Sequence, residues 1–531
     1  MRLLYILAIC SAVLLLCVFL GKISGRLGVP SLLLFMILGM CFGSDGFIKI
    51  PFDNFGMAES ICSTALIFIM FSGGFETNWA AAKATSIQGI LLSVFGVLIT
   101  AGITGLFCHF VLGMTLLEGM LIGSVVGSTD AASVFSILRS KKLNLKNGLA
   151  SVLELESGSN DPVAYTMTLI LLSFMSGGSS VPVISIFFKQ LMFGLLAGVM
   201  ISLLAVLILQ RVRFESTGMR TIFVVAAALT AYTLPSFIGG NGYLSVYVAG
   251  IIMGNSKMVQ KVELIQFFDS LSGLMQILLF FLLGLLAFPS QIPGILLTAL
   301  LIAGFMSFIA RPAAVYCIMK PFGRSFREIV FTSWAGLRGA ASIVFAIMTV
   351  TNQADPQNDI FHIIFCIALL SVTFQGSFLP LLAKKLNLVY DDENVMKTFN
   401  DYQDDTDMVL IETCIDEHSP WKDKMINEVC LPSDSLIVMI KREGNTIIPK
   451  GNTIISEGDI LISNRIASRS SSDIPLVEVP ISSEHEWTDK PLNQITLPKD
   501  SLIVMIKRNS EILIPSGNTK IQTGDILVMN M

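Results

Sequence analysis

The segment "LESGSNDPVAY" (residues 155–165) places two acids and an amide inside an apolar run. Glu156 and Asn160 are four residues apart, and so are Ser157 and Asp161, so each pair would lie on one face of a helix. A charge near the middle of a membrane costs about 2.5–3.5 kcal/mol on insertion scales. Polar residues at this cost are expected to bind something or to pair with one another.

A second polar segment, "GSTDAAS" (127–133), supplies Thr129 and Asp130 in another apolar run. Carboxylate, hydroxyl and carbonyl oxygens are the hard ligands that alkali cations prefer. Neighbouring carboxylates that are partly removed from water also retain protons more readily than exposed ones. If Asp161 and Asp130 share a pocket, we expect a cation and a proton to compete there. Asn160 adds a neutral amide and no further proton, which favours exchange of one charge for one.

The elements that position these residues are predicted to cross a membrane. Of the 531 residues, 53% are hydrophobic and only 14% are charged, whereas soluble domains contain about 25% charged residues. Apolar runs of about 20 residues recur up to about residue 386, which indicates a polytopic α-helical membrane protein. We predict thirteen spans, at approximately 2–20, 29–45, 61–80, 86–112, 115–137, 148–175, 182–210, 218–238, 242–256, 264–288, 292–319, 327–350 and 360–383.

Basic residues gather in alternate connecting loops, and this pattern orients the spans. The loops predicted to face the cytoplasm carry Lys22, Arg26, Lys83, Arg139, Lys141, Lys142, Lys146, Arg211, Arg213, Arg220, Lys257, Lys261, Lys320, Arg324 and Arg327. The intervening loops carry almost none apart from Lys49. By the positive-inside rule, the N-terminus lies outside and the tail after residue 386 lies in the cytoplasm. The first run could instead be a cleaved signal peptide, but its removal would reverse this orientation.

The segment "GLRGAAS" (336–342) aligns with "GSTDAAS" at its first glycine and at Ala-Ala-Ser. The two segments lie in the fifth and twelfth spans, so their helices run in opposite directions through the bilayer. This pattern indicates an inverted repeat that relates the first six spans to the last six. We expect discontinuous helices that cross near the midplane, where Asp130 and Arg338 would balance the ends of the half-helices.

The sequence fits other classes of protein less well. No basic stripe or nucleic-acid motif is present, and the nine cysteines have neither metal-like nor paired spacing. We expect no enzyme activity and no bound cofactor. A potassium channel gated by the tail is an alternative, although no TVGYG-like filter occurs. An intramembrane aspartyl protease using Asp130 and Asp161 is another, although the Gly-x-Gly-Asp context is missing.

Several motifs together resemble one family of transporters. They are "ESGSNDPVA", "GSTDAAS", "GGNGYLSVYVAGIIMGN" (239–255), "LLFFLLGLLAFPS" (278–290), "ARP" (310–312) and "GLRGAASIVFAI" (336–347). Residues 1–386 resemble bacterial sodium/potassium–proton exchangers of the monovalent cation:proton antiporter family, most of all its potassium/proton members with a regulatory tail. The resemblance implies a homodimer in the bacterial cytoplasmic membrane and electroneutral exchange by an elevator-like movement.

The resemblance also assigns roles to single residues. The residues that look like the ion- and proton-binding set are Asp161, Asp130, Asn160, Thr129 and Ser157. Glu156 and Arg338 look like an intramembrane ion pair. Glu76, Glu154 and Arg311 look like funnel-lining or structural charges. Between Glu156 and Asn160 stands Ser-Gly-Ser, where many sodium exchangers have bulkier apolar residues, and this looser turn leaves the cation's identity open. The likeness to potassium/proton members favours potassium, with sodium as the alternative.

The tail is predicted to contain an acidic linker (387–407) and two copies of one domain (408–465 and 474–531). Residues 421–462 recur at 487–528 with a constant offset of 66 and no gap, and both copies contain "SLIVMIKR". The copies resemble the C-terminal regulator-of-potassium-conductance domain, a small α/β module that senses ligands and pairs with itself. No Gly-x-Gly-x-x-Gly segment is present in the tail. Some relatives bind cyclic di-adenosine monophosphate in such domains, so a nucleotide regulator and passive assembly are both open.

Overall fold

The computed structural model separates into two units by its internal contacts, Met1–Val389 and Tyr390–Met531. The residues that it describes are 2–27, 30–77, 79–141, 143–176, 182–212, 214, 217–256, 258, 261–352, 358–389, 397–398, 408–415, 419, 421–429, 436–442, 445–466, 475–481, 487–495, 497, 502–508, 511–513, 515–517 and 519–530.

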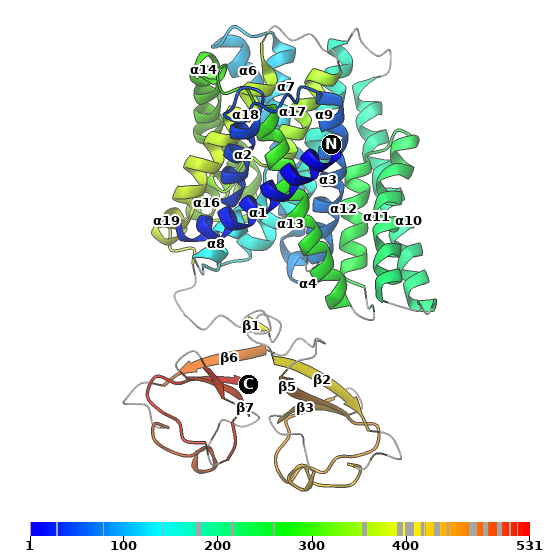
Figure 1. Cartoon of the computed structure of the whole chain (residues 1–531), viewed down its shortest axis with the longest axis vertical. Helices are drawn as coiled ribbons and strands as arrows, with labels where there is room; N and C mark the ends of the chain where they lie inside the picture. Colours follow the sequence, from blue (N-terminus) through cyan, green and yellow to red (C-terminus); the bar gives the residue numbers. More distant parts are fainter. Residues whose placement is uncertain are drawn as a thin grey trace. The chain divides into compact units, whose positions relative to one another are not determined.

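Within the described residues, helices occupy all thirteen ranges predicted as membrane spans (Figure 1). Single helices fill eight of these ranges: α1 (Arg2–Leu27), α2 (Ser31–Phe42), α3 (Phe55–Glu76), α9 (Leu149–Met175), α10 (Val183–Arg211), α11 (Thr217–Phe237), α12 (Gly242–Gly254) and α13 (Lys261–Leu286). Counted as continuous helical segments, eight in the described chain are long and apolar enough to cross a membrane. The fold is therefore that of a polytopic α-helical membrane protein.

The remaining five spans consist of shorter pieces. Three of them contain a π-helical turn: α5 (Ser86–Leu91), Leu92–Gly96 and α6 (Val97–Phe110); α14 (Ile292–Phe305), Met306–Ala310 and α15 (Arg311–Met319); and α18 (Ile360–Leu370), Ser371–Gln375 and α19 (Gly376–Lys385). The short helix α4 (Trp79–Ala82) and the 3₁₀ turn Lys83–Thr85 precede α5, and the 3₁₀ turn Lys320–Phe322 follows α15.

The other two of these five spans are broken by extended chain, which confirms the predicted discontinuous helices. The fifth span consists of α7 (Leu116–Val125) and α8 (Ala131–Ser140), and the twelfth consists of α16 (Phe326–Trp334) and α17 (Ala340–Thr351). In each case the second half-helix begins at the Ala-Ala-Ser that the two segments share. The interruptions therefore coincide with the two aligned heptapeptides.

Both broken spans begin in the same way. Thr115 starts α7 and Ser325 starts α16, each with a capping box in which a glutamate three residues later completes the exchange of hydrogen bonds. Glu118 also accepts a hydrogen bond from the Asn358 N–H at 3.2 Å. Glu328 likewise accepts one from Asn147 Nδ2 at 3.0 Å. The two asparagines each stand two residues before the next long helix, α18 or α9.

Apolar side chains fill the interior of this unit, and aromatic contacts join the helices that border the site described below. Phe268 of α13 packs against Phe71 and Phe75 of α3, with ring centroids 4.8 and 6.0 Å apart. All three side chains are buried. Contacts of this kind bury large apolar areas and hold α3 and α13 side by side.

The second unit contains the two predicted copies as two antiparallel sheets. The strands are β1 (Lys397–Thr398), β2 (Met408–Cys414), β3 (Leu436–Arg442), β4 (Asn445–Ile447), β5 (Ile460–Ile466), β6 (Pro475–Pro480), β7 (Leu502–Arg508), β8 (Glu511–Leu513) and β9 (Ile526–Asn530). Their order is β2-β5-β3-β4 in the first sheet and β1-β6-β9-β7-β8 in the second. The predicted short helices are the 3₁₀ turns Ile426–Glu428 and Leu492–Gln494.

The two copies share their register and a common core. The pairing of β3 with β5 shifts between Ile437 and Met439, and that of β7 with β9 shifts between Ile503 and Met505, again 66 residues later. One cluster of buried side chains draws on both copies: Val438, Met439, Ile462, Val504, Met505 and Val528. The copies therefore pair within one chain. The predicted hinge (468–473) lies outside the described residues, as does most of the predicted linker (387–407), within which only 387–389 and the short strand β1 are described.

Candidate functional site

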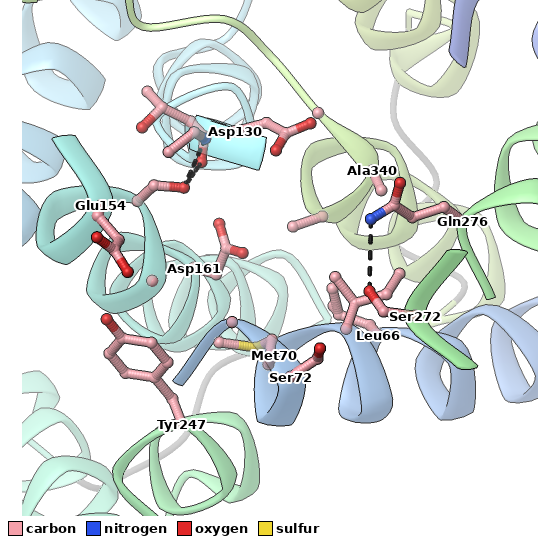
Figure 2. A pocket seen from close by; sticks show the side chains of 18 of the residues that line it. Leu66, Met70, Ser72, Asp130, Glu154, Asp161, Tyr247, Ser272, Gln276 and Ala340 are labelled. Atoms are coloured by element: carbon pink, nitrogen blue, oxygen red, sulfur yellow. Dashed lines mark hydrogen bonds between the residues drawn. The ribbon is translucent and has the colours of Figure 1, made fainter. Parts of the chain in front are cut away.

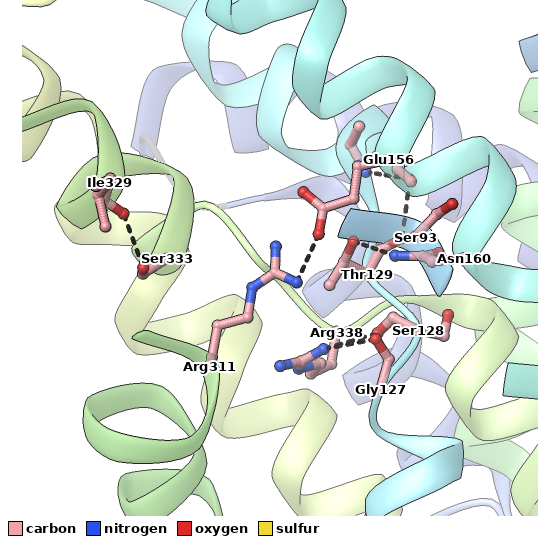
Figure 3. Close-up of polar contacts among 12 residues, drawn as sticks. Ser93, Gly127, Ser128, Thr129, Glu156, Asn160, Arg311, Ile329, Ser333 and Arg338 are labelled. Carbon is pink, nitrogen blue, oxygen red and sulfur yellow. Dashed lines mark hydrogen bonds and ion pairs between the residues drawn. The ribbon is translucent and has the colours of Figure 1, made fainter. Parts of the chain in front are cut away.

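The two broken helices meet at their interruptions. The Asp130 N–H donates a hydrogen bond to Leu337 O at 2.8 Å. Arg338 Nη1 donates to Gly127 O at 3.3 Å and to Ser128 O at 3.0 Å (Figure 3). These carbonyls follow the C-terminal end of α7, where helix carbonyls lack helical partners and carry partial negative charge. Arg338, in the second interruption, thus supplies hydrogen-bond donors to the carbonyls that follow α7 in the first.

The close approach of the two interruptions depends on a glycine. A Cβ atom placed on Gly339 would lie 2.4 Å from Asp130 Cβ and 2.8 Å from Asp130 Cγ. Such a distance is far below van der Waals contact, so any other residue at this position would push the interruptions apart. The inverted repeat therefore pairs an acid in the first half with a glycine in the second half at the same aligned position.

Polar side chains of α9 hold the first interruption in place. Ser157 Oγ donates to Thr129 O at 2.8 Å and accepts from the Ala131 N–H at 2.9 Å. Asn160 Nδ2 donates to Thr129 Oγ1 at 2.6 Å. A hydroxyl oxygen has two lone pairs, so one lone pair of Ser157 Oγ is not used by these two hydrogen bonds. The helical spacing expected for the polar residues of α9 therefore brings them to the crossing.

The two aspartates occupy different positions there. Ser128 Oγ donates a short hydrogen bond to Asp161 Oδ1. Asp130 accepts from Ser133 Oγ at 2.5 Å and from the Ser133 N–H at 3.3 Å, which is the geometry of a residue capping the start of α8. Asp130 thus fixes the restart of the helix and at the same time presents a carboxylate beside Asp161.

Both aspartates line a cavity of about 590 Å³ (Figure 2). Of the predicted site residues, Asp161, Asp130, Thr129, Ser157, Glu76 and Glu154 all line it. Asn160 is fully buried behind Thr129 and is not among the lining residues. The described lining residues include five carboxylates and no lysine or arginine. A cavity lined in this way attracts cations and offers them oxygen ligands.

The intramembrane ion pair has a different cationic partner from the one expected. Arg311 Nη1 lies 2.6 Å from Glu156 Oε1, and the two side chains are only 2% and 1% exposed (Figure 3). The contact is an ion pair by distance and not an aligned hydrogen bond. Arg338, which was predicted to pair with Glu156, instead directs its guanidinium to the carbonyls of the first interruption. The carbonyls at the crossing occupy Arg338 Nη1, and Arg311 is the arginine within ion-pair distance of Glu156.

Glu76 and Glu154 reach the cavity from two helices. Glu76 ends α3, where its Oε1 accepts a hydrogen bond from Ser72 Oγ at 2.9 Å. Glu154 lies on α9, seven residues before Asp161. Since seven residues are about two helical turns, Glu154 and Asp161 face the same cavity.

The polar lining residues that the sequence did not predict include Ser128, Tyr247 and Asp269. Ser128 stands beside Thr129 in the first interruption. Asp269 lies on α13, where Ser272 and Gln276 also line the cavity. These polar positions are three and four residues apart, so they form a stripe along one face of a helix. This pattern is visible in the sequence and could have predicted the polar face. Tyr247 gave no such signal because an aromatic residue in an apolar helix usually belongs to the core.

Comparison with known proteins identifies the family of the membrane part and the type of domain in the tail. The family described as sodium/hydrogen exchanger, transmembrane, matches residues 12–385, and the TrkA-C domain matches residues 410–462 and 476–529. The chain is 33% identical over 433 residues to the K(+)/H(+) antiporter NhaP of Alkalimonas amylolytica. This match covers 81% of this chain and 75% of that protein. It is 32% identical over 518 residues to a K(+)/H(+) antiporter of Shewanella oneidensis, covering 96% of this chain and 78% of that protein.

The fold also matches a solved structure. The sodium proton antiporter MjNhaP1 from Methanocaldococcus jannaschii at pH 8 superimposes with a TM-score of 0.65 at 24% sequence identity. The match covers 73% of this chain and 99% of that chain. It supports the overall arrangement of the helices in the membrane part.

Proposed function

The chain belongs to the sodium/hydrogen exchanger family, and on that premise we propose that it exchanges potassium or sodium for protons across the cytoplasmic membrane. The observation that carries this proposal is the shared cavity of Asp161 and Asp130, in which hydroxyl and carboxylate oxygens surround two acids. These groups suit a dehydrated alkali cation. A proton on the same carboxylates removes the negative charge that the cation needs, so the two ions bind in turn.

The proposed cycle follows from where the protons can go. With Asp161 ionised, Ser128 Oγ donates to one carboxylate oxygen and the other is available to a cation. Protonation of Asp161 releases the cation, and the neutral site returns with its proton to the opposite side. Asn160 contributes an amide to Thr129 and cannot carry a second proton. Exchange of one cation for one proton is electroneutral.

Everted membrane vesicles test the proposal. Potassium or sodium added to vesicles with a preset proton gradient is expected to dissipate that gradient. Asp161→Asn is expected to reduce the rate to that of vesicles without the protein, because the amide cannot exchange a proton. Asp53→Asn, at an exposed loop acid that accepts a hydrogen bond from Ser44, is the matched control and should exchange normally. Undiminished exchange by Asp161→Asn would refute the site assignment.

The same vesicles separate an exchanger from a channel gated by the tail. An electroneutral exchanger carries no net charge, so its rate should not change when the membrane potential is clamped at different values. A channel would give a potassium current and a rate that follows the potential. Running the assay with potassium, sodium and lithium would rank the cations.

We further propose a homodimer with the N-terminus outside and the tail in the cytoplasm, as the distribution of Lys and Arg favours. We also propose that the tail regulates exchange through its two copies (408–465 and 474–531), which follow the linker (387–407), and that a nucleotide is a candidate regulator. Deletion of 408–531 is expected to change the exchange rate while the membrane part still assembles. Size-exclusion chromatography with light scattering would report the assembly of both forms.

A further inference from the structure

Tyr247 is a large polar side chain whose position next to Glu154 and Asp161 has no assigned purpose. It lies on α12, is only 3% exposed and lines the cavity. Figure 2 shows its ring projecting from α12 toward α9, with the hydroxyl end on the side of Glu154 and Asp161. The ring is therefore packed like a core residue, while its hydroxyl faces the place where the ions are expected to bind.

The ring occupies a notch that exists because residue 158 is glycine. A Cβ atom on Gly158 would lie 2.2 Å from Tyr247 Cζ and 2.4 Å from its hydroxyl oxygen. No side chain fits there unless the ring moves. Gly158 is the middle residue of the Ser-Gly-Ser segment that separates Glu156 from Asn160. The departure from bulkier residues noted in the sequence therefore makes room for one specific aromatic ring.

The position of the hydroxyl is set by closely packed helices. A Cβ atom on Gly74 of α3 would lie 2.5 Å from Tyr247 O, and one on Gly198 of α10 would lie 2.6 Å from Ser245 O. The backbone of α12 thus touches α3 on one side and α10 on another. Packing at this distance leaves the helix little freedom to shift, so the ring enters the notch at a fixed depth.

The hydroxyl lacks a well-oriented partner within the part of the chain that the structure describes. It lies near Thr77 and Ser159, but no hydrogen bond of good geometry joins it to any described residue. A buried hydroxyl without a partner is costly, by about 1–3 kcal/mol. Buried polar groups normally have a partner, so we expect water or a bound ion to supply the one that the described residues do not.

We propose that Tyr247 is a specificity-determining residue, whose hydroxyl oxygen contacts the alkali cation directly or through one water, and that Gly158 is its positioning residue. A phenol stays neutral near pH 7. It can therefore favour the cation without adding a group that takes up a proton there. This inference rests on the proposed cation/proton exchange, and it names the oxygen that distinguishes cation binding from proton binding at the shared site.

Tyr247→Phe removes the hydroxyl and keeps the ring in its notch. In the vesicle assay the apparent KM for the preferred cation should rise about 3- to 10-fold, the factor expected from one neutral polar contact. The maximal rate should stay within about two-fold, and the pH profile at saturating cation should not move, because no proton-binding group is lost. Tyr243→Phe is the matched control, since Tyr243 lies one turn away on α12, packs against Tyr165 and Tyr232, and is not a lining residue.

Gly158→Ala tests the notch itself. Its methyl group should displace the ring and raise the KM at least as much as Tyr247→Phe, whereas Gly273→Ala, where a Cβ would meet no atom within 4 Å, should leave it unchanged. In Gly158→Ala/Tyr247→Ala the methyl has room, so the KM should equal that of Tyr247→Ala alone. If Gly158→Ala fails to fold, the Phe variant still decides.

The outcomes separate the inference from the function on which it rests. An unchanged KM for potassium, sodium and lithium in Tyr247→Phe, with normal exchange by the unmodified protein, would overturn the role of Tyr247 alone. A loss of maximal rate without a change in KM would also overturn it, because that is the result of a purely structural ring. Absence of exchange by the unmodified protein would overturn both.

Discussion

The two broken helices have the same framework and opposite charges. Each begins with a capping box, is interrupted for five residues (126–130 and 335–339) and resumes at Ala-Ala-Ser. Each capping-box glutamate also accepts a hydrogen bond from an asparagine of the other half, Glu118 from Asn358 and Glu328 from Asn147. At the centre, however, the first interruption presents Asp130 to the cavity, while the second buries Arg338 against carbonyl oxygens.

The two halves of the repeat therefore share a backbone arrangement but carry charges with different roles. A carboxylate at a cavity can gain and lose protons and cations. A guanidinium fixed on carbonyls stays charged and compensates a helix end throughout. The half that contains Asp130 is thus the one that changes its charge, and the half that contains Arg338 is the one that does not.

The largest expected effect concerns the buried ion pair, and it tests which arginine pairs with Glu156. Arg311→Gln should lower the free energy of unfolding by about 3–5 kcal/mol, because it leaves Glu156 charged, buried and unpaired. Adding Glu156→Gln should restore much of the loss, since no unpaired charge remains. Thermal unfolding of the detergent-solubilised protein is the measurement. If Glu156→Gln rescued Arg338→Gln and not Arg311→Gln, the assignment of the pair would be wrong.

The next effect tests whether the two interruptions must touch. Gly339→Ala should cost about 1–3 kcal/mol of stability and slow exchange, because its methyl group collides with Asp130. Gly304→Ala on α14, where a Cβ would meet no atom within 4 Å, is the matched control. Equal stabilities and rates for the two variants would show that the crossing tolerates separation.

The capping boxes should respond equally if the framework is shared. Thr115→Ala and Ser325→Ala each remove one cap, and each should cost about 1 kcal/mol. The same unfolding measurement compares them. A difference between the two variants larger than about 1 kcal/mol, the size of one cap, would show that the halves are not equivalent even in their backbone ends.

The tail provides a second duplication, and there the charges did not diverge. Arg442 binds Asp459 through two hydrogen bonds of 2.7 and 2.8 Å, and Arg508 binds Asp525 at the same two distances. Burial alone raises the pKa of Asp459, but the Arg442 guanidinium and the Ser456 N–H outweigh burial and hold that pKa below its usual value. The pKa of Asp525 is likewise raised by burial and lowered more strongly by Arg508.

The smallest effect follows from these two pairs. A carboxyl whose pKa is lower in the folded state stabilises the fold above its unfolded pKa of about 3.9, and this contribution disappears as the pH falls through the folded value. Intrinsic-rate-corrected hydrogen-exchange protection of β5 and β9 should stay constant from about pH 7 to pH 5 and fall below about pH 4. Arg442→Gln should weaken this dependence in β5 and leave it unchanged in β9. Identical profiles in both strands of that variant would contradict the assignment.

Much of this arrangement was predictable from the sequence, because hydropathy and repeats report directly on helices. The positions of the spans, the two interruptions and the offset of 66 residues in the tail all follow from local patterns. The partner of Glu156 did not, because the sequence places Arg311 and Arg338 in neighbouring spans without saying which face each side chain takes. Tyr247 was missed for a related reason, since its purpose depends on the absence of a side chain at Gly158 on another helix.

The hydrogen bond from the Asp130 N–H to Leu337 O joins the interruptions through their main chains. A peptide bond does not titrate, so this joint has the same strength whether Asp130 holds a proton, a cation or neither. We therefore expect the two interruptions to move together as one rigid unit during exchange and not to separate.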